Sequence, residues 1–377
     1  MTAATATEDF EAQFTALTGF RPFSWQRRLF RRLADGDVPS ALDLPTGLGK
    51  TSVMAIWLIA FAQGARLPRR LVYVVDRRAV VDQATAEAEK LRAGVDRSPE
   101  LKASFGLGRR SLPISTLRGQ FVDNRDWLAD PAGPAIIIGT VDMIGSRLLF
   151  SGYGVSPKMR PYHAGLLGAD ALVVLDEAHL VPPFAHLLRA IERDASFQPK
   201  AEADRALLPR FALLPLSATQ RDAGNEECGR LPFRLEEEDW QTDGGVSKRL
   251  KAKKRLRLEQ LAQKDQDRQL ARAAWALAMK DDKFSRVAVF CNRREKQDEG
   301  GGPSAQGVAD AIKDLANGGR KTSRAKVAIH PVELLVGGRR VHERDNVANR
   351  LRELGFIGEK KPLAKPGFLV ATSAGEV

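Results

Sequence analysis

Short runs of apolar residues that end in polar groups recur along the chain. Runs of this kind are typical of strands buried on both faces of a parallel sheet. They lie at 71–76, 135–142, 171–175 and 209–219. A longer apolar run at 51–63, closed by Gly64, predicts a buried helix, whereas the glycine- and proline-rich segment 151–165 is predicted to be a loop. The alternation of strands and helices indicates an α/β fold.

The residues 41–51 (ALDLPTGLGKT) have the layout of a phosphate-binding loop. An apolar strand end is followed by a glycine-rich turn, and Lys-Thr opens the helix. Gly47 and Gly49 let the backbone turn its N–H groups inward, and the helix adds the positive end of its dipole. Lys50 brings a charge to the β- and γ-phosphates, and Thr51 offers its hydroxyl to Mg²⁺. The alternative is an ordinary strand–turn–helix corner.

The detailed pattern of this loop points to a particular class of phosphate binder. Leu44 stands where the commonest pattern has its first glycine, and the form that begins at Thr46, Thr-Gly-x-Gly-Lys-Thr, belongs to nucleic-acid motors. Gln26 lies 24 residues before Lys50, in an amphipathic helix predicted over 20–33. A glutamine amide can bond both the donor and the acceptor on the Hoogsteen edge of adenine. We therefore predict ATP as the nucleotide; the alternative for Gln26 is a solvated side chain beside a core tryptophan.

A second motif, ALVVLDEAHL at 171–180, places two carboxylates at the end of a buried strand. Asp176 is placed to hold Mg²⁺, and Glu177 is placed to orient and polarise an attacking water molecule. His179 completes the motif and is predicted to belong to the catalytic set. For this strand end alone, the alternative is the start of a solvated loop. The phosphate loop and the two carboxylates together favour a nucleotide-hydrolysing site with ATP and Mg²⁺.

Composition and charge narrow the class of protein. A chain of 377 residues can form two domains with cores of their own, and its net charge of +12 favours a polyanionic partner. Cys228 and Cys291 lie far apart without a CxxC or Cys/His cluster, so we predict no zinc site and a cytoplasmic location. The polar, acidic start does not resemble a signal peptide, and the apolar run 53–62 is too short to span a bilayer, so no membrane partner is expected.

Polar residues follow the carboxyl ends of the predicted strands, where ligands bind in open α/β sheets. Two arginines follow the strand at 71–76, although two solvated arginines would give the same pattern. Small hydroxyl residues follow the strand at 209–219, where a turn or a helix cap is the ordinary role. The candidate nucleic-acid contacts at these strand ends are Arg77, Arg78, Thr140, Arg147, Ser217 and Thr219.

A basic run at 247–257 marks the passage to a second domain. It is interpreted either as the solvated face of a linker or as a DNA-facing strand. The predicted organisation is a first domain at 1–240, a basic linker at 241–260 and a second domain at 261–377. The second domain is predicted to contain a helix and a strand, at 271–279 and 286–293.

The order of Gln26, TGLGKT, VVDRR, GT, DEAH and SAT resembles the superfamily-two helicases. The detailed sequence of these motifs is similar to that of the CRISPR-associated helicase–nuclease of type I systems, and it suggests the type I-G (formerly I-U) branch. The segments that carry this similarity are LVYVVDRRAVVDQ, GTVDMIGSRLLFSGYG and HAGLLGADALVVLDEAHL. Asp76 departs from the pattern, because many members have proline there. The resemblance covers nearly the whole chain.

This resemblance implies a P-loop NTPase fold with tandem RecA-like domains. It also implies ATP-driven 3′→5′ translocation on single-stranded DNA and recruitment by a Cascade-type CRISPR surveillance complex. Asn292 and Arg293 match the fourth helicase motif, and Thr372 in the fifth motif would touch a DNA phosphate. Many members carry an HD nuclease with a His-Asp doublet, but none of the five histidines here precedes an aspartate, so no nuclease activity is assigned.

The resemblance also sets an expectation for activity. The sequence stops within the fifth motif, before the sixth motif and its arginine fingers, so we expect an N-terminal fragment with an incomplete second domain. Such a fragment should bind ATP and Mg²⁺ but turn over poorly. Two alternatives stay open: another superfamily-two motor, such as a restriction translocase or an RNA helicase, and a non-catalytic nucleic-acid-binding module.

Overall fold

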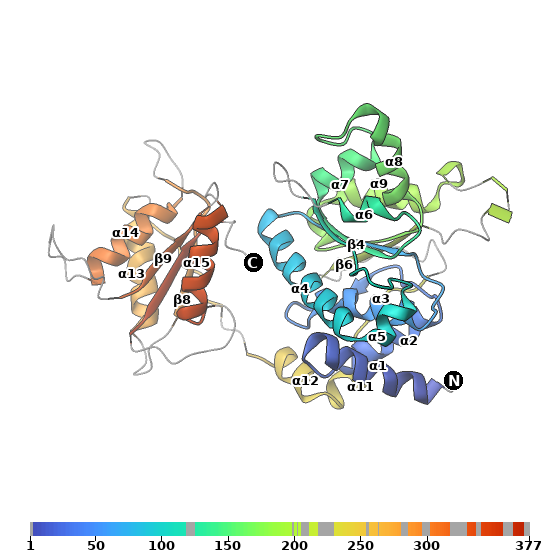
Figure 1. Cartoon of the computed structure of the whole chain (residues 1–377). Coiled ribbons are helices and arrows are strands. Elements are labelled where there is room, and N and C mark those ends of the chain that lie inside the picture. Colours follow the sequence, from blue (N-terminus) through green and yellow to red (C-terminus); the bar gives the residue numbers. More distant parts are fainter. Residues whose placement is uncertain are drawn as a thin grey trace. The chain divides into compact units, whose positions relative to one another are not determined.

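The chain forms two compact units, Met1–Lys254 and Arg255–Val377, each with its own parallel sheet (Figure 1). The computed structural model describes residues 3–117, 125–197, 200–201, 203–204, 211–217, 230–253, 256–262, 264–279, 286–295, 302–316, 330–336, 341–356 and 365–372. The division between the units falls inside the stretch 241–260. Within that stretch, α12 (Gly244–Leu250) is a helix with Val246 buried, so the start of the basic run is not a strand.

The first unit is built on a seven-stranded sheet in the order β3-β4-β2-β5-β6-β1-β7, in which neighbouring strands pair in parallel. This confirms the predicted α/β class. The strands are β1 (Leu42–Asp43), β2 (Arg70–Val75), β3 (Ile114–Leu117), β4 (Ala135–Thr140), β5 (Ala171–Leu175), β6 (Ala212–Ser217) and β7 (Phe233–Arg234). Because the strands are parallel, their carboxyl ends share one edge of the sheet.

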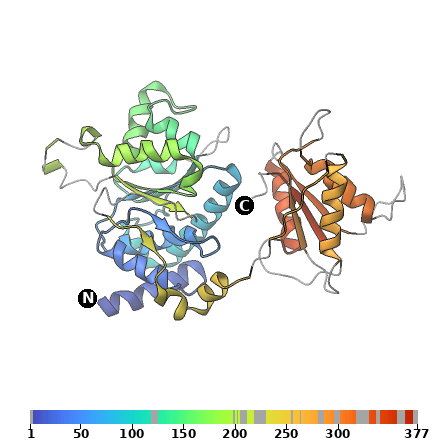
Figure 2. The same cartoon turned by 180° about the vertical axis from the view of Figure 1, so that it is seen from behind.

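Helices cover both faces of this sheet (Figures 1 and 2). In β2, Leu71 and Tyr73 belong to one core and Val72 and Val74 to the other, as the alternation of side chains along a strand requires. On the first face lie α1 (Ala3–Thr18), α2 (Ser24–Ala34), α3 (Val53–Ala62), α4 (Arg78–Arg97) and α5 (Pro99–Ser104). On the second lie α6 (Asp126–Ala129), α7 (Val141–Leu148), α8 (Arg160–Gly168) and α9 (Pro182–Arg193).

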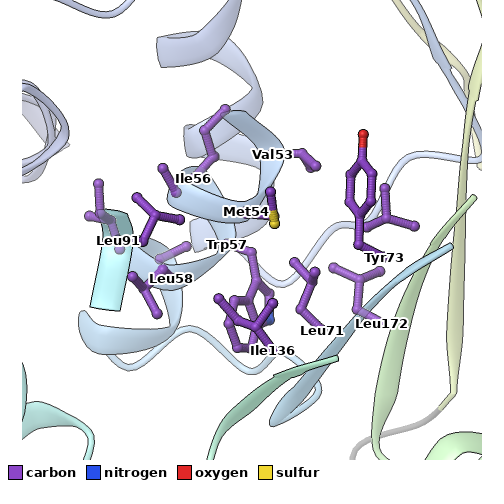
Figure 3. Close-up of a cluster of buried hydrophobic side chains, with 14 of the residues drawn as sticks. Val53, Met54, Ile56, Trp57, Leu58, Leu71, Tyr73, Leu91, Ile136 and Leu172 are labelled. Atoms are coloured by element: carbon purple, nitrogen blue, oxygen red, sulfur yellow. The ribbon is translucent and has the colours of Figure 1, made fainter. Parts of the chain in front are cut away.

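The helix α3 is the central support of the first face. It is apolar on all sides, and a helix of that kind is stable only when it is buried. Figure 3 shows its side chains packed over residues of β2, β4 and β5, among them Leu71, Ile136 and Leu172. The indole Nε1 of Trp57 donates to the Pro68 carbonyl at 3.0 Å, so the polar atom of this buried ring is satisfied. The core thereby fixes the start of α3 at the carboxyl edge of the sheet.

Gly94 in α4 allows close contact with α1. A Cβ added there would lie 2.6 Å from Leu17 Cδ2 and 3.4 Å from Leu17 Cα. Gly94→Ala is therefore expected to lower the free energy of unfolding by about 1–3 kcal/mol. Gly165→Ala in α8 is the matched control, because nothing lies within 4 Å of an added Cβ, and we expect it to raise stability by ~0.5–1 kcal/mol. Urea unfolding followed by circular dichroism measures both; equal stability of the two variants would contradict the contact.

The segment 151–165, predicted as a loop, is partly helical. The helix α8 begins at Arg160 and has a proline in its first turn. Proline is accepted there because the first N–H groups of a helix have no partner within the helix. The loop prediction was therefore wrong for the last residues of the segment. No helix in the described part of the chain is both long and apolar enough to cross a bilayer.

The second unit has a three-stranded parallel sheet in the order β8-β10-β9. Its strands are β8 (Arg286–Phe290), β9 (Val332–Leu335) and β10 (Gly367–Ala371), and its helices are α13 (Gln266–Ala278), α14 (Ala305–Ala316) and α15 (Val341–Glu353). Trp275 stacks on Phe368 with ring centroids 5.6 Å apart, inside a core of its own. The predicted helix 271–279 corresponds to α13, and the predicted strand 286–293 is shorter than expected.

Candidate active site

The phosphate loop turns through two glycines in the left-handed region. Gly47 has φ 82° and Gly49 has φ 76°, values that a residue with a side chain rarely adopts. A Cβ at Gly47 would meet nothing within 4 Å, so the space beside the loop is open. Leu48 between them is fully buried and anchors the loop to the core. Lys50 then begins a short 3₁₀ turn, Lys50–Ser52, that leads into α3.

Lys50 meets Glu177 from the second motif. The Lys50 side chain is only 9% exposed, and its Nζ donates to Glu177 Oε1 at 3.2 Å. The other carboxylate oxygen, Oε2, lies 3.3 Å from His179 Nδ1. Glu177 has a left-handed backbone, with φ 46° and ψ 49°, a conformation that costs ~1–3 kcal/mol in a residue with a side chain. Glu177 thus pairs with the charge of Lys50, and an incoming phosphate would compete with this carboxylate.

Asp176 is oriented by two donors. The hydroxyl of Tyr73 donates to Asp176 Oδ2 at 2.9 Å, and the Glu177 N–H donates to Oδ1 at 3.0 Å. Burial raises the pKa of Asp176, and the hydrogen bond from Tyr73 acts in the opposite direction. Burial and the neighbouring Asp176 raise the pKa of Tyr73 well above its usual value, whereas a hydrogen bond from the Thr51 side chain lowers it. Tyr73 was not predicted as a site residue.

The two predicted Mg²⁺ ligands fit that ion. The carboxylate of Asp176 accepts from the Tyr73 hydroxyl at 2.9 Å, and the side chain of Thr51 influences the pKa of the same phenol, so both lie near Tyr73. Mg²⁺ takes oxygen ligands, keeps several waters and is commonly held by one or two carboxylates together with substrate phosphates. The described residues contain no cluster of three or more His, Cys, Asp or Glu that could hold a metal ion. As a hydroxyl and a carboxylate, Thr51 and Asp176 are oxygen donors of the kind that suits Mg²⁺ bound together with phosphates.

Gln26 lies beside the phosphate loop. Its side chain is 4% exposed, so the alternative of a solvated glutamine is excluded. Its Oε1 accepts from the Phe23 N–H at 2.8 Å, and its Nε2 donates to Ser52 Oγ at 2.7 Å. A Cβ added at Gly49 would lie 3.8 Å from the same Nε2. To bind adenine, Gln26 would have to exchange these partners, and adenine recognition stays a prediction.

Arg28 fixes the helix that carries Gln26. One guanidinium nitrogen, Nη2, donates to Asp239 Oδ2 and to the Arg234 carbonyl, each at 2.6 Å. The guanidinium also lies over the Phe233 ring, 4.2 Å from its centroid. Asp239 is almost fully buried, so the pair is well shielded from water. The end of the first unit thereby holds α2 against the sheet.

A comparison with models of protein families shows to which family the chain belongs. The ResIII model, described as "Type III restriction enzyme, res subunit", matches residues 19–219, more than half of the sequence. The matched span includes Gln26, the phosphate loop and both carboxylates.

The chain belongs to the ResIII family.

Comparisons with individual proteins agree with this ResIII fold. A stretch of 88 residues is 34% identical to Reverse gyrase 2 of Aeropyrum pernix, covering 23% of this chain and 7% of that protein. The DUF1998 helicase MrfA bound to DNA and AMPPNP has a TM-score of 0.55 at 15% identity, over 96% of this chain and 44% of that one. T. fusca Cas3 with AMPPNP has a TM-score of 0.54 at 16% identity, over 96% and 41%. Mss116p bound to ssRNA and AMP-PNP has a TM-score of 0.54 at 15% identity, over 99% and 64%.

The parallel seven-stranded sheet and the similarity to these solved structures together confirm the predicted RecA-like fold. The ResIII chain spans less than two thirds of the length of each of these solved chains and a small part of the reverse gyrase. At such low identity, the solved structures show the fold alone.

Three of the predicted nucleic-acid contacts of the first unit, Arg77, Thr140 and Ser217, lie at strand ends on the edge that holds the phosphate loop. Arg147 lies instead in the last turn of α7. Arg77 precedes α4, and the side chain of Arg78 lies outside the described residues. Thr140 is buried and caps α7 by accepting from the Met143 N–H at 3.3 Å. Three further candidates complete the set. Arg147 is buried and donates to the Met143 carbonyl at 2.9 Å. The Ser217 carbonyl accepts from the Leu44 N–H at 3.1 Å. Thr219 lies outside the described residues.

In the second unit of the chain, Asn292, Arg293 and Thr372 lie at the carboxyl edge of the smaller sheet. Asn292 is exposed just after β8, and Thr372 follows β10, with its N–H donating to the Leu335 carbonyl at 3.1 Å. The parallel pairing of β8 with β10 brings the two strand ends together. Nucleic-acid binding at either edge stays a prediction.

Proposed function

We propose that this ResIII chain binds ATP with Mg²⁺ and hydrolyses it to drive movement along nucleic acid. The observation that carries the proposal is the meeting of Lys50 and Glu177, with Asp176 beside them, at the carboxyl edge of the first sheet. A cation next to two carboxylates, at a glycine-rich loop, suits the phosphates, the metal ion and the attacking water of one hydrolysis reaction.

Each residue has a separate role in this proposal. Lys50 and the loop N–H groups would hold the β- and γ-phosphates, which would displace Glu177 from Lys50. Glu177 would then be available to orient the attacking water. Thr51 and Asp176 would hold Mg²⁺, which neutralises phosphate charge when it is bound. Gln26 would recognise the adenine, with α2 fixed by the Arg28 contacts.

We further propose that the nucleic acid is single-stranded DNA and that movement along it runs 3′→5′. We also propose that the chain serves type I CRISPR interference, in the I-G branch, with a Cascade-type complex as its partner. The sequences of the helicase motifs support this assignment, and so does the fold shared with T. fusca Cas3. The net charge of +12 suits an anionic polymer. A restriction translocase or an RNA motor is the second candidate, favoured by the family description and by the RNA-bound Mss116p fold.

The test is ATP hydrolysis with single-stranded DNA, duplex DNA and RNA, together with DNA affinity measured across salt concentrations with and without AMPPNP. We expect single-stranded DNA to stimulate hydrolysis most, and AMPPNP to change DNA affinity at every salt concentration. Strand displacement on duplexes with 3′ or 5′ overhangs then reports direction. Stronger stimulation by RNA or duplex DNA would favour the second candidate. DNA binding that is insensitive to nucleotide, without hydrolysis, would indicate a binding module.

A further inference from the structure

Tyr73 connects the core of the first unit to the candidate active site. Its side chain is 1% exposed and belongs to the core beneath α3. Figure 3 shows the ring near Val53, with its oxygen directed away from the other labelled side chains. That oxygen lies at Asp176, 103 residues further along the chain, because β2 pairs with β5 and Tyr73 lies opposite Val174.

We propose that Tyr73 is a positioning residue for Mg²⁺: its hydroxyl donates to Asp176 Oδ2 at 2.9 Å and so orients the carboxylate that is predicted to hold the metal ion. This inference rests on the proposed function. Neither the sequence motifs nor the family match assigns a role to this tyrosine.

The hydrogen-bond inventory of the carboxylate supports this role. Each carboxylate oxygen has two lone pairs, and one of them is taken on Oδ2 by Tyr73 and one on Oδ1 by the Glu177 N–H. The plane of the Asp176 carboxylate is therefore fixed, while a lone pair on each oxygen stays available for Mg²⁺ or its water. Partners that orient metal ligands in this way typically change metal affinity by about 10- to 100-fold when they are removed.

A purely space-filling role would not require the hydroxyl. Leu71 and Val75, the neighbours of Tyr73 on the same face of β2, are aliphatic and belong to the same core. Phenylalanine would fill the volume of the ring equally well. A buried hydroxyl costs free energy unless it is hydrogen-bonded, and here its partner, Asp176, is a predicted Mg²⁺ ligand. Removing the hydroxyl alone therefore separates positioning from packing.

The test is Tyr73→Phe, with ATP affinity measured in EDTA and in saturating Mg²⁺ by equilibrium titration of a fluorescent ATP analogue. The ratio of the two affinities is the Mg²⁺ enhancement. We expect affinity in EDTA to stay at the wild-type value and the enhancement to fall by about 10-fold or more. Tyr162→Phe is the matched control, because the Tyr162 hydroxyl donates to the Leu128 carbonyl at 3.0 Å on the other face of the sheet. Its enhancement should equal that of the wild type.

The outcomes separate this inference from the proposed function. An unchanged Mg²⁺ enhancement in Tyr73→Phe would overturn the positioning role. An equal loss of affinity in EDTA and in Mg²⁺ would also overturn it, since that result indicates a general effect on structure. Wild-type protein that binds no ATP in either condition would overturn the proposed function, and with it this inference; that result does not depend on the variant.

Discussion

Glu177→Gln is expected to slow ATP hydrolysis by about 10²- to 10⁴-fold while ATP binding persists. Glutamine keeps the shape of the side chain but loses the negative charge that, in the proposed function, would polarise the attacking water. It also loses the charge that pairs with Lys50, because Glu177 Oε1 accepts from Lys50 Nζ at 3.2 Å. Phosphates then meet less competition for Lys50, so ATP affinity should equal or exceed that of the wild type. Single-turnover hydrolysis and equilibrium titration measure the two effects.

Another Lys–Glu pair provides the control for Glu177→Gln. On the surface of α4, Lys90 Nζ lies 2.6 Å from Glu87 Oε1, and both side chains are exposed. Glu87→Gln removes the same charge from a similar pair, and exposed pairs of this kind contribute ~0–1 kcal/mol. It should leave both hydrolysis and ATP affinity unchanged. Hydrolysis by Glu177→Gln within about threefold of the wild-type rate would contradict the role of Glu177 as the water-orienting group.

The strands β2, β4, β5 and β6 could be predicted because burial on both faces leaves a contiguous apolar run, whereas the short strands β3 and β7 were missed. The helix α1 was missed, since its sequence is short of strong apolar positions. Among the side chains of α1 whose burial is described, Phe10, Phe14 and Leu17, spaced four and three residues apart, mark the buried face. That spacing is the helical signal that could have revealed it. Burial of these three side chains, rather than local propensity, accounts for the helix.

The candidate site was predictable where its residues are contiguous. Lys50 and Glu177 belong to continuous motifs, and their contact follows from the shared edge of a parallel sheet. Tyr73 and Arg28 act through partners more than 100 residues away, and those contacts depend on strand order and on the return of the chain to α2. The left-handed backbone of Glu177 is also not visible in the sequence, because glutamate has no preference for it.

Lys50→Ala is expected to weaken ATP binding by about 10- to 150-fold, which corresponds to the ~1.5–3 kcal/mol of a hydrogen bond to a charged group. The fold should persist, because Glu177 is 31% exposed and keeps His179 beside it. Lys90→Ala, on the exposed pair of α4, is the control and should bind ATP as the wild type does. Equilibrium titration of the fluorescent analogue measures both. Wild-type affinity in Lys50→Ala would show that this loop does not hold the phosphates.

The pairing of Lys50 with Glu177 makes a further prediction for the two variants combined. If the phosphates displace Glu177 from Lys50, any gain in ATP affinity from Glu177→Gln depends on the lysine being present. Lys50→Ala combined with Glu177→Gln should therefore bind ATP as weakly as Lys50→Ala alone, and the two effects should not add. Additive effects on ATP affinity would instead mean that Lys50 and Glu177 act on the nucleotide independently, and that their contact at 3.2 Å is not broken when ATP binds.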